Sequence, residues 1–172
     1  MSAYRAPYDR VVLLVTVIAS IALLAATVAM LGVAAAISLP VVRVLCGALA
    51  VGILAILVFS YVLAPKGYRI EPGRLVVERP AGPLTFALDA PVEIRRADRL
   101  GPTLRTWGNG GLFGAYGRFR NKELGAFRAY SRRSHDYVVI RTPSLTLVAG
   151  PEDPDQFVHD LQLAAAGEPH SS

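Results

Sequence analysis

The sequence has little charge and almost no cysteine. Only 18% of its 172 residues are charged, whereas 53% are hydrophobic, and ordinary globular domains have about 25% charged residues. This composition excludes an intrinsically disordered chain and indicates a membrane segment. The single Cys excludes an internal disulfide framework and a multi-cysteine zinc site.

Charge is missing above all from one long run near the N-terminus. The residues from Val11 to Leu63 include a single charge, Arg43. One helix of that length would measure about 80 Å, whereas the hydrocarbon core of a bilayer is about 30 Å thick and needs about 20 residues. We therefore expect three segments: a first membrane span at 11–31, an extracytoplasmic turn at 32–43 and a second span at 44–63.

The charges that flank the two spans predict their orientation. Arg5 and Arg10 precede the first span, and three basic residues (Lys66, Arg69 and Arg74) follow the second. By the positive-inside rule both termini are cytoplasmic, with residues 1–10 forming a cytoplasmic N-terminus. An alternative is that residues 1–36 are a cleaved signal peptide, although the apolar run is longer than the usual signal core of about 7–15 residues.

From Gly67 onward the pattern is that of a small β domain. Short apolar or alternating runs are separated by turn residues such as Pro72-Gly73, a typical type II turn pair. Seven strands are predicted: 68–70, 75–77, 84–88, 92–95, 127–131, 137–141 and 145–148. A helix follows, capped by Asp153 and with Phe157 and Leu161 on one face. We expect a mainly-β barrel or sandwich over 67–166, capped by this helix, and a flexible tail at 167–172.

A glycine-rich stretch, Gly108–Gly125 (GNGGLFGAYGRFRNKELG), carries a resemblance to a known family. Together with the strand pattern, it resembles the pleckstrin-homology (PH) superfold, and more closely the bacterial PH-like domains that follow two transmembrane helices. The resemblance implies a PH-like barrel over roughly 67–163 and a multi-pass protein of the bacterial inner (plasma) membrane. Relatives that bind phosphoinositides carry spaced basic residues in the first hairpin, whereas Glu71–Arg74 offers one Arg.

The glycine-rich stretch lies within a predicted loop of 30 residues, 97–126. Loops above about 12–15 residues usually have a function or a structure of their own. Its aromatic residues could contact a partner or the membrane interface, or they could fill the core. We expect Phe113 and Phe119 in the core, and for Trp107 and Tyr116 both readings remain open. The candidate binding residues are Trp107, Asn109, Phe113, Tyr116, Arg118, Phe119, Arg120, Lys122, Arg132 and Arg133.

Basic residues gather in the same region. Ten of them lie between Arg95 and Arg133, against only Asp98 and Glu123. Such a face could contact anionic lipid headgroups, or it could be an ordinary solvated surface. We expect no nucleic-acid partner. The sequence shows no nucleophile–base set and no metal-ligand spacing, so we expect no catalytic residues, no metal and no cofactor.

The short connection after the second span places the domain at the membrane, and three functional hypotheses fit this position. Ala64–Gly67 is only four residues long and reaches at most about 14 Å, which places the domain against the headgroups. The first hypothesis is a non-enzymatic membrane protein whose domain mediates protein–protein interaction or self-association at the membrane surface. The second is a sensor of anionic lipid that uses Arg118, Arg120, Lys122, Arg132 and Arg133. The third is an accessory subunit of a membrane enzyme or transporter.

Overall fold

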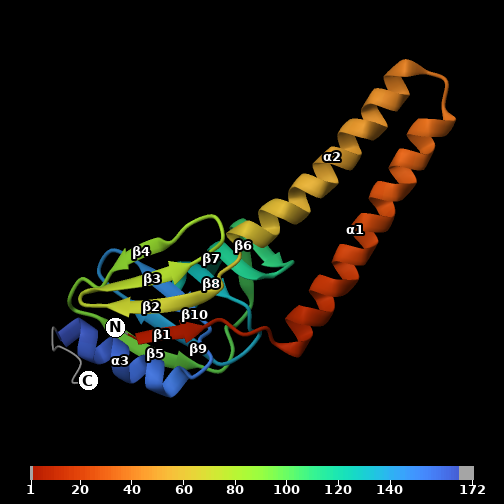
Figure 1. Ribbon diagram of the computed structural model, residues 1–172. Helices are drawn as coiled ribbons and strands as arrows, with labels where there is room; N and C mark the ends of the chain where they lie inside the picture. Colours follow the sequence, from red (N-terminus) through yellow and green to blue (C-terminus); the bar gives the residue numbers. More distant parts are fainter. Residues whose placement is uncertain (1, 167–172) are drawn as a thin grey trace.

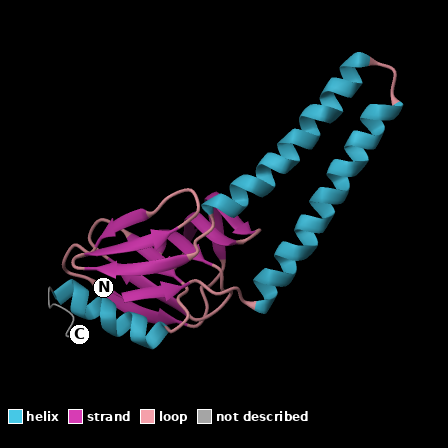
Figure 2. Cartoon of the chain, viewed as in Figure 1, coloured by secondary structure: helices cyan, strands magenta, loops and turns pink. Residues whose placement is uncertain are grey.

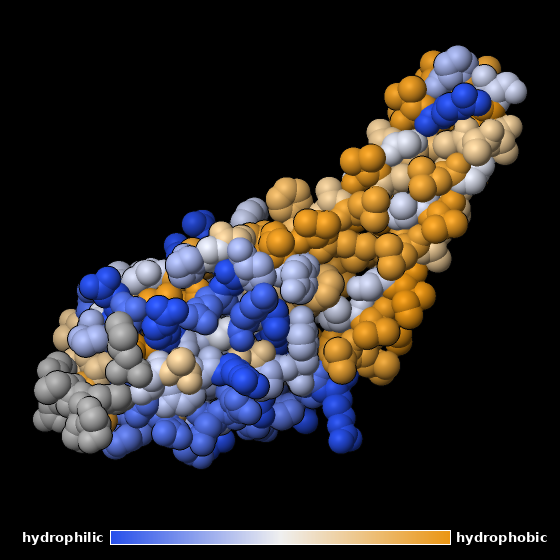
Figure 3. Space-filling model, viewed as in Figure 1, coloured by the Kyte–Doolittle hydropathy of each residue, from blue (hydrophilic) through white to orange (hydrophobic). Residues whose placement is uncertain are grey.

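A computed structural model describes residues 2–166 and consists of a helical hairpin and a β domain (Figure 1). The hairpin contains α1 (Arg10–Ala36) and α2 (Pro40–Leu63), which lie antiparallel along each other. Both helices are long and apolar enough to cross a membrane, and only 11% of the most apolar window of each is buried. The hairpin surface is mainly hydrophobic and the domain surface mainly hydrophilic (Figure 3). The predicted tail, 167–172, lies outside the described residues.

The turn between the helices is shorter than the expected 32–43. Only residues 37–39 separate α1 from α2, because Ala34-Ala35-Ala36 continues the first helix and Pro40 suits the first position of the second. Arg43 then caps the end of α1: Nε donates to the Ala34 carbonyl at 3.2 Å and Nη2 to the Ile37 carbonyl at 3.1 Å. Carbonyls at a helix end otherwise lack partners.

The β domain is a two-sheet sandwich covered by a terminal helix (Figures 1 and 2). One sheet has the order β1-β2-β3-β4 and the other β5-β9-β10-β8-β7-β6. The strands are β1 (Ser2–Arg5), β2 (Gly67–Glu71), β3 (Arg74–Glu78), β4 (Leu84–Ala87), β5 (Glu93–Ala97), β6 (Thr103–Gly111), β7 (Gly114–Asn121), β8 (Gly125–Ser131), β9 (Tyr137–Arg141) and β10 (Thr146–Ala149). Helix α3 spans Pro154–Ala166. The expected fold class is confirmed, with ten strands in place of seven.

Strand β1 was not predicted, because residues 1–10 were expected to be only a flank of the first helix. It pairs antiparallel with β2, with Tyr4 opposite Tyr68. The helical hairpin is therefore inserted between two neighbouring strands of one sheet, and both ends of the hairpin return to the same domain. This pairing argues against cleavage of residues 1–36, since cleavage would remove a strand.

The predicted loop at 97–126 is wrong over most of its length. It contains the β6–β7 hairpin, in which Gly108 lies opposite Gly117. The two strands approach so closely there that a Cβ on Gly108 would lie 2.2 Å from the Tyr116 carbonyl oxygen, and one on Gly117 would lie 2.4 Å from the Trp107 carbonyl oxygen. Both glycines also have positive φ, a conformation that side chains disfavour.

The main core lies between the two sheets and α3. Tyr68, Phe157 and Leu161 are fully buried there, and the Tyr4 ring meets the Phe157 ring edge-on at 5.0 Å. The start of α3 is capped as expected, because Asp153 Oδ1 accepts from the backbone N–H groups of residues 155 and 156 at 3.1 and 3.0 Å. The core thereby holds β1, and with it the start of α1, against α3.

Candidate functional site

The tip of the β6–β7 hairpin lies against both helices. Asn109 Nδ2 donates to Ser60 Oγ in α2 at 3.2 Å, and the backbone N–H of Phe113 donates to Thr16 Oγ1 in α1 at 3.0 Å. The Phe113 ring packs edge-on against Tyr61 of α2, with ring centroids 5.6 Å apart. The hairpin thus contacts the helices at the ends that adjoin the β domain.

These contacts satisfy two hydroxyl groups that lie in mainly apolar helices. Thr16 and Ser60 are both buried, and a buried polar group without a hydrogen bond is costly. Asn109 is itself held in place, because Nδ2 also lies 3.0 Å from the Leu112 carbonyl oxygen and 3.2 Å from Tyr116 Oη. The tip is therefore a built junction between the domain and the helices.

A mainly apolar groove of about 650 Å³ runs beside this junction, between α2 and β6. Helix α2 contributes Ala55, Ile56 and Phe59, and β6 contributes Arg105 and Trp107. Trp107 is 69% exposed, which answers the open question on this residue: it does not fill the core. The groove joins the apolar surface of a helix to polar residues of the domain.

A second depression, of about 760 Å³, lies at the opposite end of the hairpin. It is lined by Leu104, Arg120 and Lys122 together with the β7–β8 turn. Leu104 is 75% exposed and lies directly opposite Arg120. Within residues 2–166, β6 pairs with β7 alone, so no strand covers its outer edge.

Of the remaining predicted aromatic residues, Phe119 and Tyr116 lie inside the domain and Phe113 lies at the junction with the helices. Phe119 is buried and stacks on Phe127 with ring centroids 5.9 Å apart, as expected. Tyr116 is also buried, and its hydroxyl contacts Asn109. Phe113 is half-buried between the main core and the helices, so its role is shared between packing and the junction.

The expected basic face of five residues does not form. Arg118, Arg120 and Lys122 are exposed. Arg132 is instead buried, with its guanidinium 4.4 Å from the centre of the Tyr8 ring. Arg133 is occupied as well, since it donates to the Pro151 carbonyl at 2.8 Å and to Asp136 at 3.0 Å. Arg132 and Arg133 therefore do not add to an exposed basic face, and the lipid-sensing hypothesis stays a prediction.

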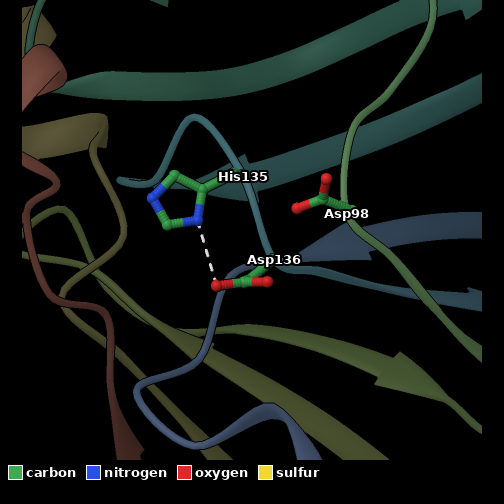
Figure 4. A group of neighbouring side chains, drawn as sticks. All are labelled: Asp98, His135 and Asp136. Carbon is green, nitrogen blue, oxygen red and sulfur yellow. Dashed lines mark hydrogen bonds and ion pairs between the residues drawn. The ribbon is translucent and has the colours of Figure 1, made fainter.

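Sequence reasoning missed a cluster of Asp98, His135 and Asp136, drawn in Figure 4. One ligand atom from each lies within 4.8 Å of the others, as in a metal site. Asp136, however, pairs with Arg133 at 3.0 Å and with Arg96 at 3.8 Å, and two guanidinium groups on one carboxylate oppose a divalent cation. We interpret the cluster as an ion-pair network. His135 and Asp136 are adjacent in the sequence, but Asp98 is distant from both, so spacing could not reveal the cluster.

The same network reaches the start of α1. His135 Nε2 lies 3.6 Å from Asp9 Oδ2, and Ser134 donates hydrogen bonds to Asp9 from its hydroxyl and its backbone N–H. The Ser134 side-chain hydrogen bond holds the pKa of Asp9 below its ordinary value, against a smaller opposing effect of desolvation. The carboxylate therefore stays charged and links α1 to the β8–β9 connection.

The β domain matches a known protein family. The model of a family described as Bacterial PH domain matches residues 66–165. The chain belongs to the bacterial PH domain family. The match begins after α2 and ends within α3, so β1 and the helical hairpin lie outside it. Searches of curated proteins and of solved structures gave no match.

The first hairpin of this bacterial PH domain has no free basic cluster. Arg69 pairs with Glu78 and lies 3.9 Å from Glu71, while Arg74 lies 3.6 Å from Glu71. Both arginines of the β2–β3 hairpin therefore have carboxylate partners. This agrees with the departure, already seen in the sequence, from relatives that bind phosphoinositides.

Proposed function

We propose that this chain is a non-enzymatic protein of the bacterial plasma membrane whose PH domain binds a partner protein at the membrane surface. The observation that carries the proposal is the free outer edge of β6 beside the depression at Leu104. Long exposed edge strands are usually avoided or covered, because they pair with other chains. The β6 edge is exposed in the isolated chain, and in the proposed complex the partner protein covers it.

The partner proposed here is an extended acidic segment of another protein. Such a segment adds to a sheet edge through main-chain hydrogen bonds, while its side chains occupy neighbouring pockets. Next to β6 stand three exposed cations, Arg118, Arg120 and Lys122, and within the described chain none of them has an ion-pair partner. An apolar side chain of the segment would contact Leu104, and its carboxylates would pair with these cations.

The membrane location rests on the helices and their flanks. Two apolar helices of sufficient length lead directly into the domain, and basic residues are more numerous at the domain end than at the Arg43 end. We therefore place both termini in the cytoplasm. A domain fixed at the membrane meets other membrane-bound proteins at high effective concentration.

Site-specific photocrosslinking in intact membranes tests the partner. A photoreactive residue at Leu104 is expected to capture a specific protein, whereas one at Gln162, on the exposed side of α3, is the control. Charge reversal in the double variant Arg120→Glu/Lys122→Glu should abolish capture from position 104. Equal capture from both positions, or capture that survives charge reversal, would contradict the proposal.

Protease protection tests the orientation. Protease added outside cells with a permeable outer barrier should leave residues 67–166 intact, and membrane disruption should expose them. Digestion before disruption would place the domain on the other side.

A further inference from the structure

We propose that the groove between α2 and β6 binds one anionic phospholipid, with an acyl chain along α2 and the phosphate at Arg105. The inference rests on the proposed membrane crossing of the helices, but it is independent of any partner on the outer edge of β6. The site differs from the five basic residues expected from the sequence, of which none lines this groove.

The helix side of the groove has the properties of a surface that contacts acyl chains. Ile56 and Phe59 are both more than half exposed, and they lie on a helix that is apolar enough to cross the bilayer. Because Phe59 is four positions before the end of α2, it lies about 6 Å from that end. The apolar part of the groove thus opens toward the hydrocarbon region and its polar part toward the headgroups.

The domain side of the groove contributes one charged residue, the positively charged Arg105. Arg105 is exposed and has neither an ion pair nor a side-chain hydrogen bond to any residue in 2–166. A guanidinium forms paired hydrogen bonds with a phosphate. All other lining residues in the described chain are uncharged, so the groove has no acidic group that would repel an anion. This charge favours an anionic lipid over a zwitterionic one.

The polar neighbours also suit the headgroup region. Trp107, Asn109 and Tyr116 line the groove next to Arg105, and Trp and Tyr are enriched where membranes meet water. The volume of about 650 Å³ falls within the range of small-molecule sites, about 300–1,000 Å³. It accommodates a headgroup phosphate and the upper part of one acyl chain, the remainder of the lipid staying in the bilayer.

The sole Trp of the chain makes the site directly measurable. Trp107 lines the groove, and the sequence has no other Trp, so its fluorescence reports on this position alone. The full-length protein is reconstituted in phosphatidylcholine vesicles that contain equal small fractions of brominated phosphatidylglycerol or brominated phosphatidylcholine. Bromine on the upper acyl chain quenches Trp on contact.

We expect brominated phosphatidylglycerol to associate about five-fold more strongly than brominated phosphatidylcholine, the effect of one charge at the membrane surface. Arg105→Gln should remove this preference, while the charge-matched control Arg99→Gln, on an exposed residue that does not line the groove, should retain it. Circular dichroism of each variant verifies the fold.

Three outcomes would overturn the inference. Equal quenching by the two lipids would show that no anionic lipid is selected. An equal loss of preference in Arg99→Gln and Arg105→Gln would show a diffuse surface attraction. Absence of quenching by either lipid in a protein that remains in the membrane fraction would show that the groove is filled by protein. A protein that does not enter the vesicles at all would instead contradict the proposed membrane crossing.

Discussion

Asn109 of β6 and Ser60 of α2 are hydrogen-bonded at 3.2 Å although 49 positions separate them in the sequence. This bond, with that between Phe113 and Thr16, fixes the hairpin tip to both helices. The domain is therefore attached to the helices in three ways: by the chain before α1, by the chain after α2, and by a hairpin that has no covalent connection to either helix end. The third attachment makes the position of β6 depend on the helices.

Replacing Asn109 with Ala should loosen this attachment. The substitution removes the hydrogen bonds of Nδ2 and leaves the buried Ser60 hydroxyl without this donor, which should lower the free energy of unfolding by about 1–3 kcal/mol. Hydrogen–deuterium exchange of the detergent-solubilised protein should accelerate in residues 108–116. The exposed amide variant Gln162→Ala should leave that exchange unchanged, and equal rates in the two variants would contradict the assigned role.

The glycine pair in the β6–β7 hairpin gives a second prediction. Gly117→Ala places a Cβ against the Trp107 carbonyl and forces a side chain into a positive φ, so it should destabilise the protein by about 2–4 kcal/mol. Gly111→Ala is the matched control, because a Cβ there meets no atom within 4 Å. Thermal unfolding of both variants decides the matter, and similar midpoints would refute the close approach.

Arg43 should stabilise the far end of the helical hairpin. Arg43→Met removes both hydrogen bonds to the α1 carbonyls, at a cost of about 1–3 kcal/mol, and amide exchange in residues 34–40 should accelerate. Arg43→Lys retains the charge but lacks the two-pronged guanidinium, so an intermediate effect is expected. Unchanged exchange in Arg43→Met would mean that water replaces the cap at no cost.

The lowered pKa of Asp9 predicts a pH-dependent contribution to stability. The charged carboxylate is favoured in the folded state mainly by the Ser134 hydroxyl, so its stabilisation is present above about pH 4, the ordinary pKa of Asp. It disappears as the pH falls through the lowered pKa. Wild type should therefore be more stable than Ser134→Ala at pH 7, and the difference should shrink below pH 4. A difference that is constant with pH would exclude this linkage.

Most of the architecture could be predicted from local patterns. The scarcity of charge between Val11 and Leu63 located both helices, and the seven predicted strands all coincide with observed ones. Strands β6 and β7 were missed because glycine weakens a strand prediction. The alternation of Arg118, Phe119 and Arg120, exposed, buried and exposed, was the signal that could have found β7.

The candidate site was less predictable because its contacts are not local. Asn109 and Phe113 were predicted as candidate binding residues, but no residue near them in the sequence indicates that Ser60 and Thr16 are their partners. Arg132 was expected on a basic surface, and its burial depends on Tyr8, a distant residue that provides the aromatic face. Strand β1 was missed for the same reason, because its four residues pair with the distant strand β2.

The pairing of β1 with β2 has a consequence for biosynthesis. β1 is translated before either helix and β2 only after both, so the first strand has no neighbour until the whole apolar stretch has left the ribosome. If, in the proposed membrane topology, only one of the two helices crosses the bilayer, β1 and β2 end on opposite sides and the sheet stays incomplete. A complete sheet therefore requires that both helices cross or that neither does, so a protease that degrades incomplete β domains would also remove copies in which a single helix is inserted.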